Sequence, residues 1–310
     1  MSSEIHLPLV SIVIPAYNHA AFLAEAIDSV LAQDYPNIEL IVLDDGSTDN
    51  TVEILKGYGD AFHWETHANM GQANTLNKGW AMARGEVFSY LSADDVLLPC
   101  AVSRSLGFLK EGIALTYCDF NLFDPSSKII RKVSVPDFSY QEMFSRLICQ
   151  PGPGVFFTRQ AFLAAGRWNS SYRQMPDYEY WLRLGLQGMF VRVPEVLASF
   201  RVHEASQTFA VADEFKASEP VRIISGFIEE HPLPAELADL KYVALSNAWI
   251  ATAQLHIRAG RFGRGFAALR KAFGLCARNF LSLRILKILF NSVFNRTLHR
   301  IVRRLNRLRS

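Results

Sequence analysis

The sequence predicts an α/β fold in which a mostly parallel sheet with flanking helices is followed by an all-α C-terminal region. Short apolar, β-branched runs alternate with helical patterns over roughly the first 100 residues, an order typical of a parallel sheet. Polar residues directly follow three of these runs. From about residue 235 onward the pattern is helical only, so we expect domains at 1–231 and 232–310.

Four strands and three helices are expected in the first 100 residues. Pro15 is expected to stop the first strand, and Gly85 to follow the end of the third helix. The expected strands cover 9–14, 38–43, 63–66 and 87–91, and the helices cover 20–33, about 48–56 and 74–83.

The middle of the chain is less regular. Its expected strands cover 113–118, 128–133, 155–158, 190–193 and 197–200, and its expected helices cover 160–165 and 178–187. Leu182 and the other apolar residues of the second helix are expected to belong to the core.

The composition is that of one large globular domain or two smaller ones. The 310 residues are 50% hydrophobic and 20% charged, which excludes a disordered or collagen-like chain. The four cysteines show no CxxC spacing, so we expect free thiols in a reducing compartment. Neither a signal peptide nor an uncharged apolar stretch of 18 or more residues is evident, so no spanning helix is expected.

The formal net charge of +2 hides a strong asymmetry. Residues 241–310 hold fifteen Lys and Arg and no Asp or Glu, whereas residues 1–240 carry an acidic excess of thirteen. A basic tail on an acidic body suggests an anionic partner, namely a membrane surface, a nucleic acid or an acidic protein.

The candidate functional residues directly follow three of the expected strands. The segment 15–18 follows the first strand, Asp44 and Asp45 follow the second, and Asp94 and Asp95 follow the fourth. In parallel sheets, ligands bind beyond the carboxyl ends of the strands. Adjacent carboxylates at such an end suit a hard divalent cation, which can bridge a diphosphate. A helix cap or a solvated turn is the alternative for either pair alone.

Four blocks of sequence, in order, resemble family 2 glycosyltransferases of the GT-A fold. The first runs from VSIVIPAYN to LDDGSTDNT, and the second is GQANTLNKGWAMARGEVFSYLSADD. The third is MPDYEYWLRL and the fourth is FRVHEASQT. The resemblance covers about residues 9–208 and implies a GT-A, Rossmann-like sheet.

The resemblance implies a binding site for a nucleotide-sugar donor. Pro15 and Tyr17 would line the pocket for the nucleotide base, and Asp45 would accept a hydrogen bond from the base. Lys78 and Arg84 are weaker candidates for donor contacts, because a solvated face is the default interpretation for a basic residue on or just after a helix.

The resemblance also implies a divalent cation, Mg²⁺ or Mn²⁺, and a catalytic base. Asp94 would face the ribose and the diphosphate, and Asp95 would bind the metal. His203 would reach the metal or the diphosphate. Asp177 would be the general base that acts on the acceptor hydroxyl.

Two positions depart from the family pattern. Ser92 stands where the first aspartate of the common LDADD form lies, and Pro176 replaces the usual glutamate before Asp177. Glu179 is the alternative base. These departures leave a non-catalytic scaffold with a degenerate GT-A domain as one alternative function.

Together these features predict a metal-dependent, inverting transferase that moves a sugar from a UDP-sugar to a glycan or lipid-linked acceptor in cell-surface polysaccharide synthesis. A sugar-phosphate nucleotidyltransferase is the enzymatic alternative. Such enzymes usually carry a glycine-rich, basic loop after the first strand, whereas this chain has the segment 15–19 there.

The C-terminal region has two features of interest. Residues 245–272 fit one tetratricopeptide-like helix pair, with an ordinary helical hairpin as the alternative. Residues 281–309 combine an apolar stripe with many arginines, which suits the anionic inner face of the cell membrane and a peripheral cytoplasmic protein. Docking on the acidic body and a homo-oligomer are alternatives. Nucleic acid is not expected as the partner of residues 281–309, because this stretch has few aromatic residues interleaved with its basic residues for stacking on bases.

Overall fold

The computed structural model describes residues 7–203 and 212–281 and divides the chain into two compact units. Of the described residues, unit 1 comprises 7–138, 149–171 and 176–203, and the others form unit 2. The expected boundary near residue 232 placed α9 (Glu219–Glu230) in the first domain, but this helix belongs to unit 2. The segment 139–148 also belongs to unit 2, although unit 1 surrounds it in sequence.

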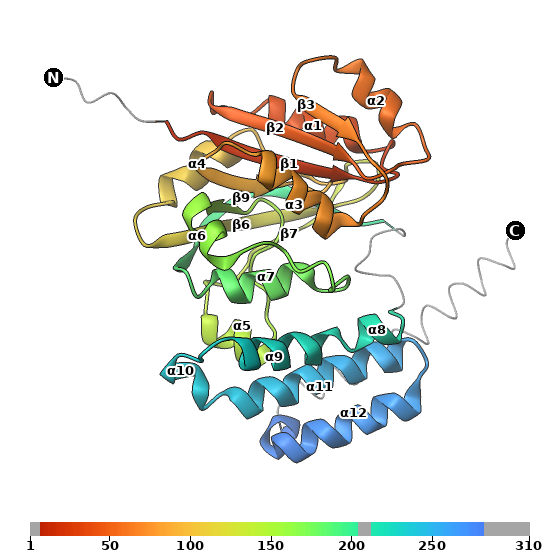
Figure 1. Cartoon of the computed structure of the whole chain (residues 1–310), viewed down its shortest axis with the longest axis vertical. Helices are drawn as coiled ribbons and strands as arrows, with labels where there is room; N and C mark the ends of the chain where they lie inside the picture. Colours follow the sequence, from red (N-terminus) through yellow and green to blue (C-terminus); the bar gives the residue numbers. More distant parts are fainter. Residues whose placement is uncertain (1–6, 204–211, 282–310) are drawn as a thin grey trace, which may run out of the picture. The chain divides into compact units, whose positions relative to one another are not determined.

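The first half of unit 1 is the expected parallel sheet (Figure 1). Its strands are β1 (Val10–Ala16), β2 (Ile38–Asp44), β3 (His63–Thr66) and β4 (Val87–Tyr90), in the spatial order β3-β2-β1-β4. All three pairings are parallel, and Ala16 lies beside Asp44 in the register. The carboxyl ends of these strands therefore share one edge of the sheet.

The second half of the sheet has mixed directions. It continues from β4 through β8 (Phe156–Thr158), β6 (Ile113–Phe123), β9 (Met189–Arg201) and β5 (Val96–Leu97), and β7 (Ile129–Val133) pairs with β6. Only β6 and β9 are parallel to each other here. Asp94 and Asp95 form a turn after β4, called the DD turn below, and β5 directly follows this turn. Because β5 pairs with the 13-residue β9, the end of β9 lies near the DD turn.

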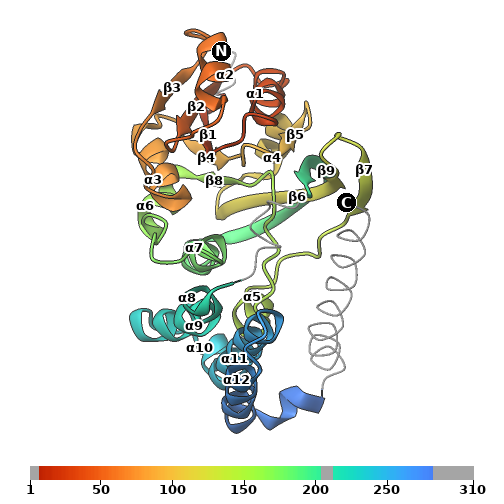
Figure 2. The same cartoon turned by 90° about the vertical axis from the view of Figure 1, so that its right-hand side faces the viewer.

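Helices cover both faces of the sheet. Figure 2 shows α1 (Leu23–Leu31) and α3 (Gln72–Met82) on opposite sides of β1 and β2. The apolar stripe of α1 packs on Ile12, Ile14 and Val42 in the main hydrophobic core. The remaining helices of unit 1 are α2 (Thr51–Gly57), α4 (Ala101–Phe108), α6 (Arg159–Ala165) and α7 (Pro176–Leu184).

Two prolines behave differently from expectation. Pro15 does not stop β1, which continues to Ala16. The backbone position of Pro15 faces β4, whose ladder ends at the Val13–Tyr90 pair, so no ladder hydrogen bond is lost. The expected strands 190–193 and 197–200 are one strand. Its register against β6 shifts after Val193, and the resulting bulge accommodates Pro194.

Unit 2 is helical. Its helices are α5 (Tyr140–Arg146), α8 (Glu214–Ala217), α9, α10 (Ala235–Ala238), α11 (Lys241–Arg258), α12 (Phe262–Leu275) and the 3-10 helix η2 (Ala277–Leu281). Figure 1 shows α9, α11 and α12 side by side. The helix pair expected at 245–272 corresponds to α11 and α12, which meet through the small residues Gly265, Ala268 and Ala272. Within residues 7–203 and 212–281, no helix is both long enough and apolar enough to cross a bilayer.

Candidate active site

The turn after β2 is built around two buried aspartates. Asp44 accepts hydrogen bonds from the Thr66 hydroxyl at 2.6 Å and from the Ser47 backbone N–H at 3.2 Å. Asp45 accepts from the backbone N–H groups of Met70 and Gly71 at 2.7 and 2.9 Å. The carboxylates therefore hold both the turn itself and the loop that precedes α3.

Gly46 allows these two segments to approach closely. Its φ of +75° lies in the left-handed region, and a Cβ there would lie 2.9 Å from the backbone nitrogen of Asn69. Tyr17, at the end of β1, is 46% exposed beside this turn region, whereas Pro15 is buried in the strand. The expected base-pocket residues thus lie at neighbouring strand ends.

One carboxylate and two imidazoles form a potential metal site. The Asp94 Oδ2 atom lies 2.9 Å from His203 Nε2 and 3.9 Å from His19 Nε2. The three ligand atoms all lie within 4.8 Å of one another. His19 follows β1, Asp94 follows β4 and His203 follows β9, so three separate strand ends supply the donors. One carboxylate with two imidazoles suits a divalent transition-metal ion, a class that includes Mn²⁺, whereas Mg²⁺ prefers oxygen ligands alone.

Asp95, the expected metal ligand, lies outside this cluster. Its side chain is 4% exposed, and its Oδ1 atom accepts the backbone N–H of Arg201 at 2.9 Å. Burial, together with the neighbouring Asp94 carboxylate, raises the pKa of Asp95. Asp94 thus belongs to the three-residue cluster, whereas Asp95 takes part in the hydrogen bonding of the turn.

Asp177, the expected base, lies in the first turn of α7. Burial raises the pKa of its carboxyl group. The pKa of Tyr90, at the end of β4, is raised by burial and by the charges of Asp177, Cys149 and Asp95. The charge of Asp177 therefore acts on Tyr90, at the strand end that leads into the DD turn.

An aromatic core anchors α7. Trp181 and Tyr180 are buried, and both rings contact Trp168 and Phe157. The core role expected for Trp181 is confirmed. Trp168 is 4% exposed and belongs to the same cluster.

The alternative base, Glu179, is engaged elsewhere. Its two carboxylate oxygens accept from Nε and Nη2 of Arg183 at 2.7 and 2.9 Å. Arg183 also donates to the backbone carbonyls of Ala165 and Arg167. Glu179 therefore ties α7 to the loop after α6.

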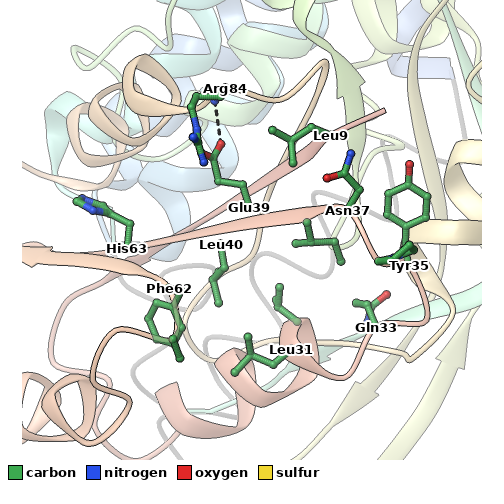
Figure 3. A pocket seen from close by; sticks show the side chains of 14 residues that line it. Leu9, Leu31, Gln33, Tyr35, Asn37, Glu39, Leu40, Phe62, His63 and Arg84 are labelled. Carbon is green, nitrogen blue, oxygen red and sulfur yellow. Dashed lines mark hydrogen bonds and ion pairs between the residues drawn. The ribbon is translucent and has the colours of Figure 1, made fainter. Parts of the chain in front are cut away.

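The two basic donor candidates are each paired with a carboxylate outside the cluster. Lys78 forms an ion pair with Glu65 of β3. Arg84 donates from its backbone N–H and its Nε to Glu39, at the amino end of β2, at 2.8 and 2.6 Å (Figure 3). The structure thus places Arg84 at the edge of the sheet opposite the DD turns.

A cavity of about 810 Å³ lies at that opposite edge, and Figure 3 shows the side chains that line it. Most of its polar side chains are already hydrogen-bonded within the chain. Tyr35 donates to Pro8, Asn37 to Leu7 and Gln33 to Leu98, in each case to the backbone oxygen. This cavity therefore has few polar groups left to orient a ligand.

Three residues of the site escaped the sequence analysis. His19 follows the P-x-Y-N segment, Tyr90 ends the strand before the DD turn, and Arg201 lies two positions before His203. Their positions inside the first, second and fourth sequence blocks were the available signal. Their roles depend on contacts between distant segments, which no single-sequence pattern specifies.

Comparison with known proteins gives consistent matches. A family model described as glycosyl transferase family 2 matches residues 11–167. An uncharacterized glycosyltransferase of Rickettsia prowazekii is 32% identical over 240 residues, and the match covers 74% of each chain. The chondroitin synthase of Pasteurella multocida is 32% identical over 208 residues, which cover 65% of this chain and 21% of that enzyme.

Two solved structures resemble the whole fold. The mannosyltransferase PcManGT from Pyrobaculum calidifontis, in complex with GDP-Man and Mn²⁺, gives a TM-score of 0.64 at 16% identity and covers 97% of this chain and 88% of that one. S. aureus TarS 1–349, in complex with UDP-GlcNAc, gives a TM-score of 0.58 at 14% identity, with 87% and 92% covered. The expected GT-A fold is confirmed.

Proposed function

The chain belongs to glycosyl transferase family 2 and is a glycosyltransferase, and from this premise we propose that it is metal-dependent and inverts the anomeric configuration. The observation that carries the proposal is the Asp94–His203–His19 cluster at the carboxyl edge of the sheet. Family membership argues against the nucleotidyltransferase alternative, and the retention of Asp45, Asp94, Asp95 and Asp177 together argues against the scaffold alternative. We further propose a UDP-sugar as the donor, since TarS was solved with UDP-GlcNAc, although PcManGT was solved with GDP-Man.

In this proposal, the three clustered side chains hold Mn²⁺, and Asp95 supports the turn. When bound there, the cation supplies positive charge next to the diphosphate of the donor. Tyr17, Pro15 and the turn of Asp45 form the base pocket. Lys78 remains a proposed donor contact. Arg84 is left out because it pairs with Glu39 at the opposite edge.

Asp177 acts as the base. Its carboxylate takes the proton of the acceptor hydroxyl while that oxygen forms a bond to the anomeric carbon. The bond from this carbon to the diphosphate oxygen breaks, and the nucleoside diphosphate leaves with the electron pair. One displacement from the face opposite the leaving group inverts the configuration. Burial raises the pKa of Asp177, which makes its carboxylate a stronger proton acceptor than an exposed one.

A panel of UDP- and GDP-sugars tests the proposal. Each donor is incubated with Mn²⁺, Mg²⁺ or chelator, and release of nucleoside diphosphate is measured for wild type, Asp94→Asn and Asp95→Asn. We expect chelator-sensitive release that Asp94→Asn loses and Asp95→Asn largely keeps. Equal rates with and without chelator would refute metal dependence. The reverse order of the two variants would assign the metal to Asp95.

We also propose a lipid-linked or glycan acceptor at the inner, cytoplasmic face of the membrane. The stretch 281–309, on which this proposal first rests, lies outside the described residues except for Leu281. Support within the described part comes from residues 241–281, which hold seven Lys and Arg and no acidic residue. On α12, the side chains of Phe266 and Phe273 are 65% and 57% exposed. Exposed aromatic residues among cations suit an anionic lipid surface.

Co-sedimentation with vesicles of purely neutral lipid and with vesicles that also contain anionic lipid is the test of the membrane proposal. We expect binding only to anionic vesicles, weakened in a Phe266→Ser/Phe273→Ser double variant. Leu163→Ser, at a residue 67% exposed in unit 1, is the matched control. Equal binding to both vesicle types would contradict the proposal.

A further inference from the structure

Arg201 is a buried cation that joins three segments around the cluster. Its side chain is 1% exposed. Nε donates to the backbone carbonyl of Asp94 at 2.8 Å, and Nη2 donates to Glu25 of α1 at 2.5 Å. Nη1 donates at 3.1 Å to the backbone carbonyl of Asp124 and to the Ser127 hydroxyl, both in the turn between β6 and β7.

Two aromatic rings enclose the same guanidinium. Its central carbon lies 4.5 Å from the centre of the Phe22 ring and 4.0 Å from that of the Phe123 ring. The Phe22 ring also lies 5.3 Å from the ring of His203. The cation therefore packs against a ring that contacts one of the potential metal ligands.

Arg201 also contacts both residues of the DD turn. The side chain binds the backbone oxygen of Asp94, and the backbone N–H binds the carboxylate of Asp95 at 2.9 Å. His203 follows only two residues later on the same chain segment. One residue thus fixes the turn that carries Asp94 and the strand end that leads to His203.

We propose that Arg201, held by Glu25, is a positioning residue that sets the metal affinity of the cluster. The inference rests on the proposed metal dependence. A planar guanidinium can serve all these acceptors at once, whereas a lysine ammonium has three donors and no plane to lie between two rings. Supporting partners of this kind typically change metal affinity by 10–100-fold.

Mn²⁺ affinity, measured by electron paramagnetic resonance on the full chain without donor, tests the inference. Arg201→Lys should weaken Mn²⁺ binding by about 10-fold or more. Glu25→Gln should weaken it by a smaller factor, about 3-fold, because the amide oxygen still accepts a hydrogen bond without the charge. The Glu25 side chain is 44% exposed, so this variant should fold even if Arg201→Lys does not.

Glu53→Gln is the matched control, since Glu53 forms an exposed ion pair with Lys56 on α2. It should leave the Mn²⁺ affinity unchanged. Thermal unfolding of the metal-free proteins separates positioning from folding, because a purely structural role would lower the melting temperature without changing the Mn²⁺ dissociation constant. Unchanged affinity in Glu25→Gln, and in Arg201→Lys where folded, would overturn the inference. Absence of Mn²⁺ binding by wild type would instead overturn the proposed metal dependence on which the inference rests.

Discussion

Neutralising Asp177 and Glu179 one at a time should separate catalysis from stability within one helical turn. Both residues lie in the first turn of α7, two positions apart. Asp177 is the proposed base, whereas Glu179 holds Arg183 through two hydrogen bonds. Asp177→Asn and Glu179→Gln remove the charge and nearly preserve the shape, so each variant serves as the control for the other.

Asp177→Asn is expected to lower the turnover rate, whereas Glu179→Gln is expected to lower the melting temperature. Loss of a general base costs about 10²–10⁴ in rate, or about 3–5 kcal/mol in the barrier. Burial raises the pKa of Asp177, so the charged form is disfavoured there and a neutral amide should leave the melting temperature unchanged or higher.

The Glu179→Gln substitution is expected to lower the free energy of unfolding. The Arg183 and Glu179 side chains are only 13% and 12% exposed. Breaking such a buried pair costs about 3–5 kcal/mol when the remaining charge has no other partner. Because Arg183 keeps the carbonyls of Ala165 and Arg167, we expect about 2 kcal/mol, or a melting temperature lower by roughly 4–8 °C.

Donor hydrolysis, with water as the acceptor, is the assay that needs no identified acceptor. The turnover rate is measured at saturating donor and Mn²⁺ for both variants, alongside donor binding and thermal unfolding. Asp177→Asn should bind donor normally and turn it over slowly, whereas Glu179→Gln should turn it over at nearly the wild-type rate. A folded Glu179→Gln variant without turnover, next to an active Asp177→Asn variant, would show that the base assignment is wrong.

Three further predictions concern the metal, the pH and the sheet. His203→Ala and His19→Ala should each weaken Mn²⁺ binding by at least about 10-fold in calorimetry; unchanged affinity in either would remove that residue from the proposed site. Because burial raises the pKa of Asp177 and only the carboxylate accepts a proton, kcat should fall with decreasing pH at a midpoint above about 4; a midpoint at or below that value would contradict this reasoning. Gly85→Ala should destabilise the protein by about 1–3 kcal/mol in urea unfolding, since a Cβ there would lie 2.7 Å from a backbone oxygen, whereas Gly107→Ala, with no atom within 4 Å, should not.

Local patterns were sufficient to predict the parallel half of the sheet. The expected strand at 63–66 coincides with β3, and the other three expected strands differ from β1, β2 and β4 by only one or two residues at their ends. Each of these strands is a short apolar run followed by polar residues. The apolar run predicts the strand, and the polar residues mark the end of that strand at the carboxyl edge of the sheet. The strand-end signal also pointed to Asp44, Asp45, Asp94 and Asp95 for the site, whereas His203 was predicted from the family resemblance alone.

The rest of the fold and of the candidate site depends on tertiary contacts, which local sequence patterns do not specify. The Pro194 bulge sits inside a continuous strand because β6 offers a register shift at that point. Arg84 looked like a donor ligand beside a helix, but Glu39, 45 residues earlier, holds it at the opposite edge. Arg201 and Glu25 are 176 residues apart, and neither belongs to a pattern that reveals the other.

The division of the chain into its two units bears on how the protein forms during synthesis. Helix α5 belongs to the helical unit, where the Phe144 ring lies 5.9 Å from that of Phe227, and Asn247 of α11 binds the backbone oxygen of Ser145. Translation proceeds at about 5–20 residues per second. The apolar side chains of α5 therefore leave the ribosome roughly 4–17 seconds before α9 can cover them. During that interval the apolar face of α5 is uncovered, between two stretches of sequence that belong to the sheet unit. We expect a chaperone to bind the nascent chain at this segment.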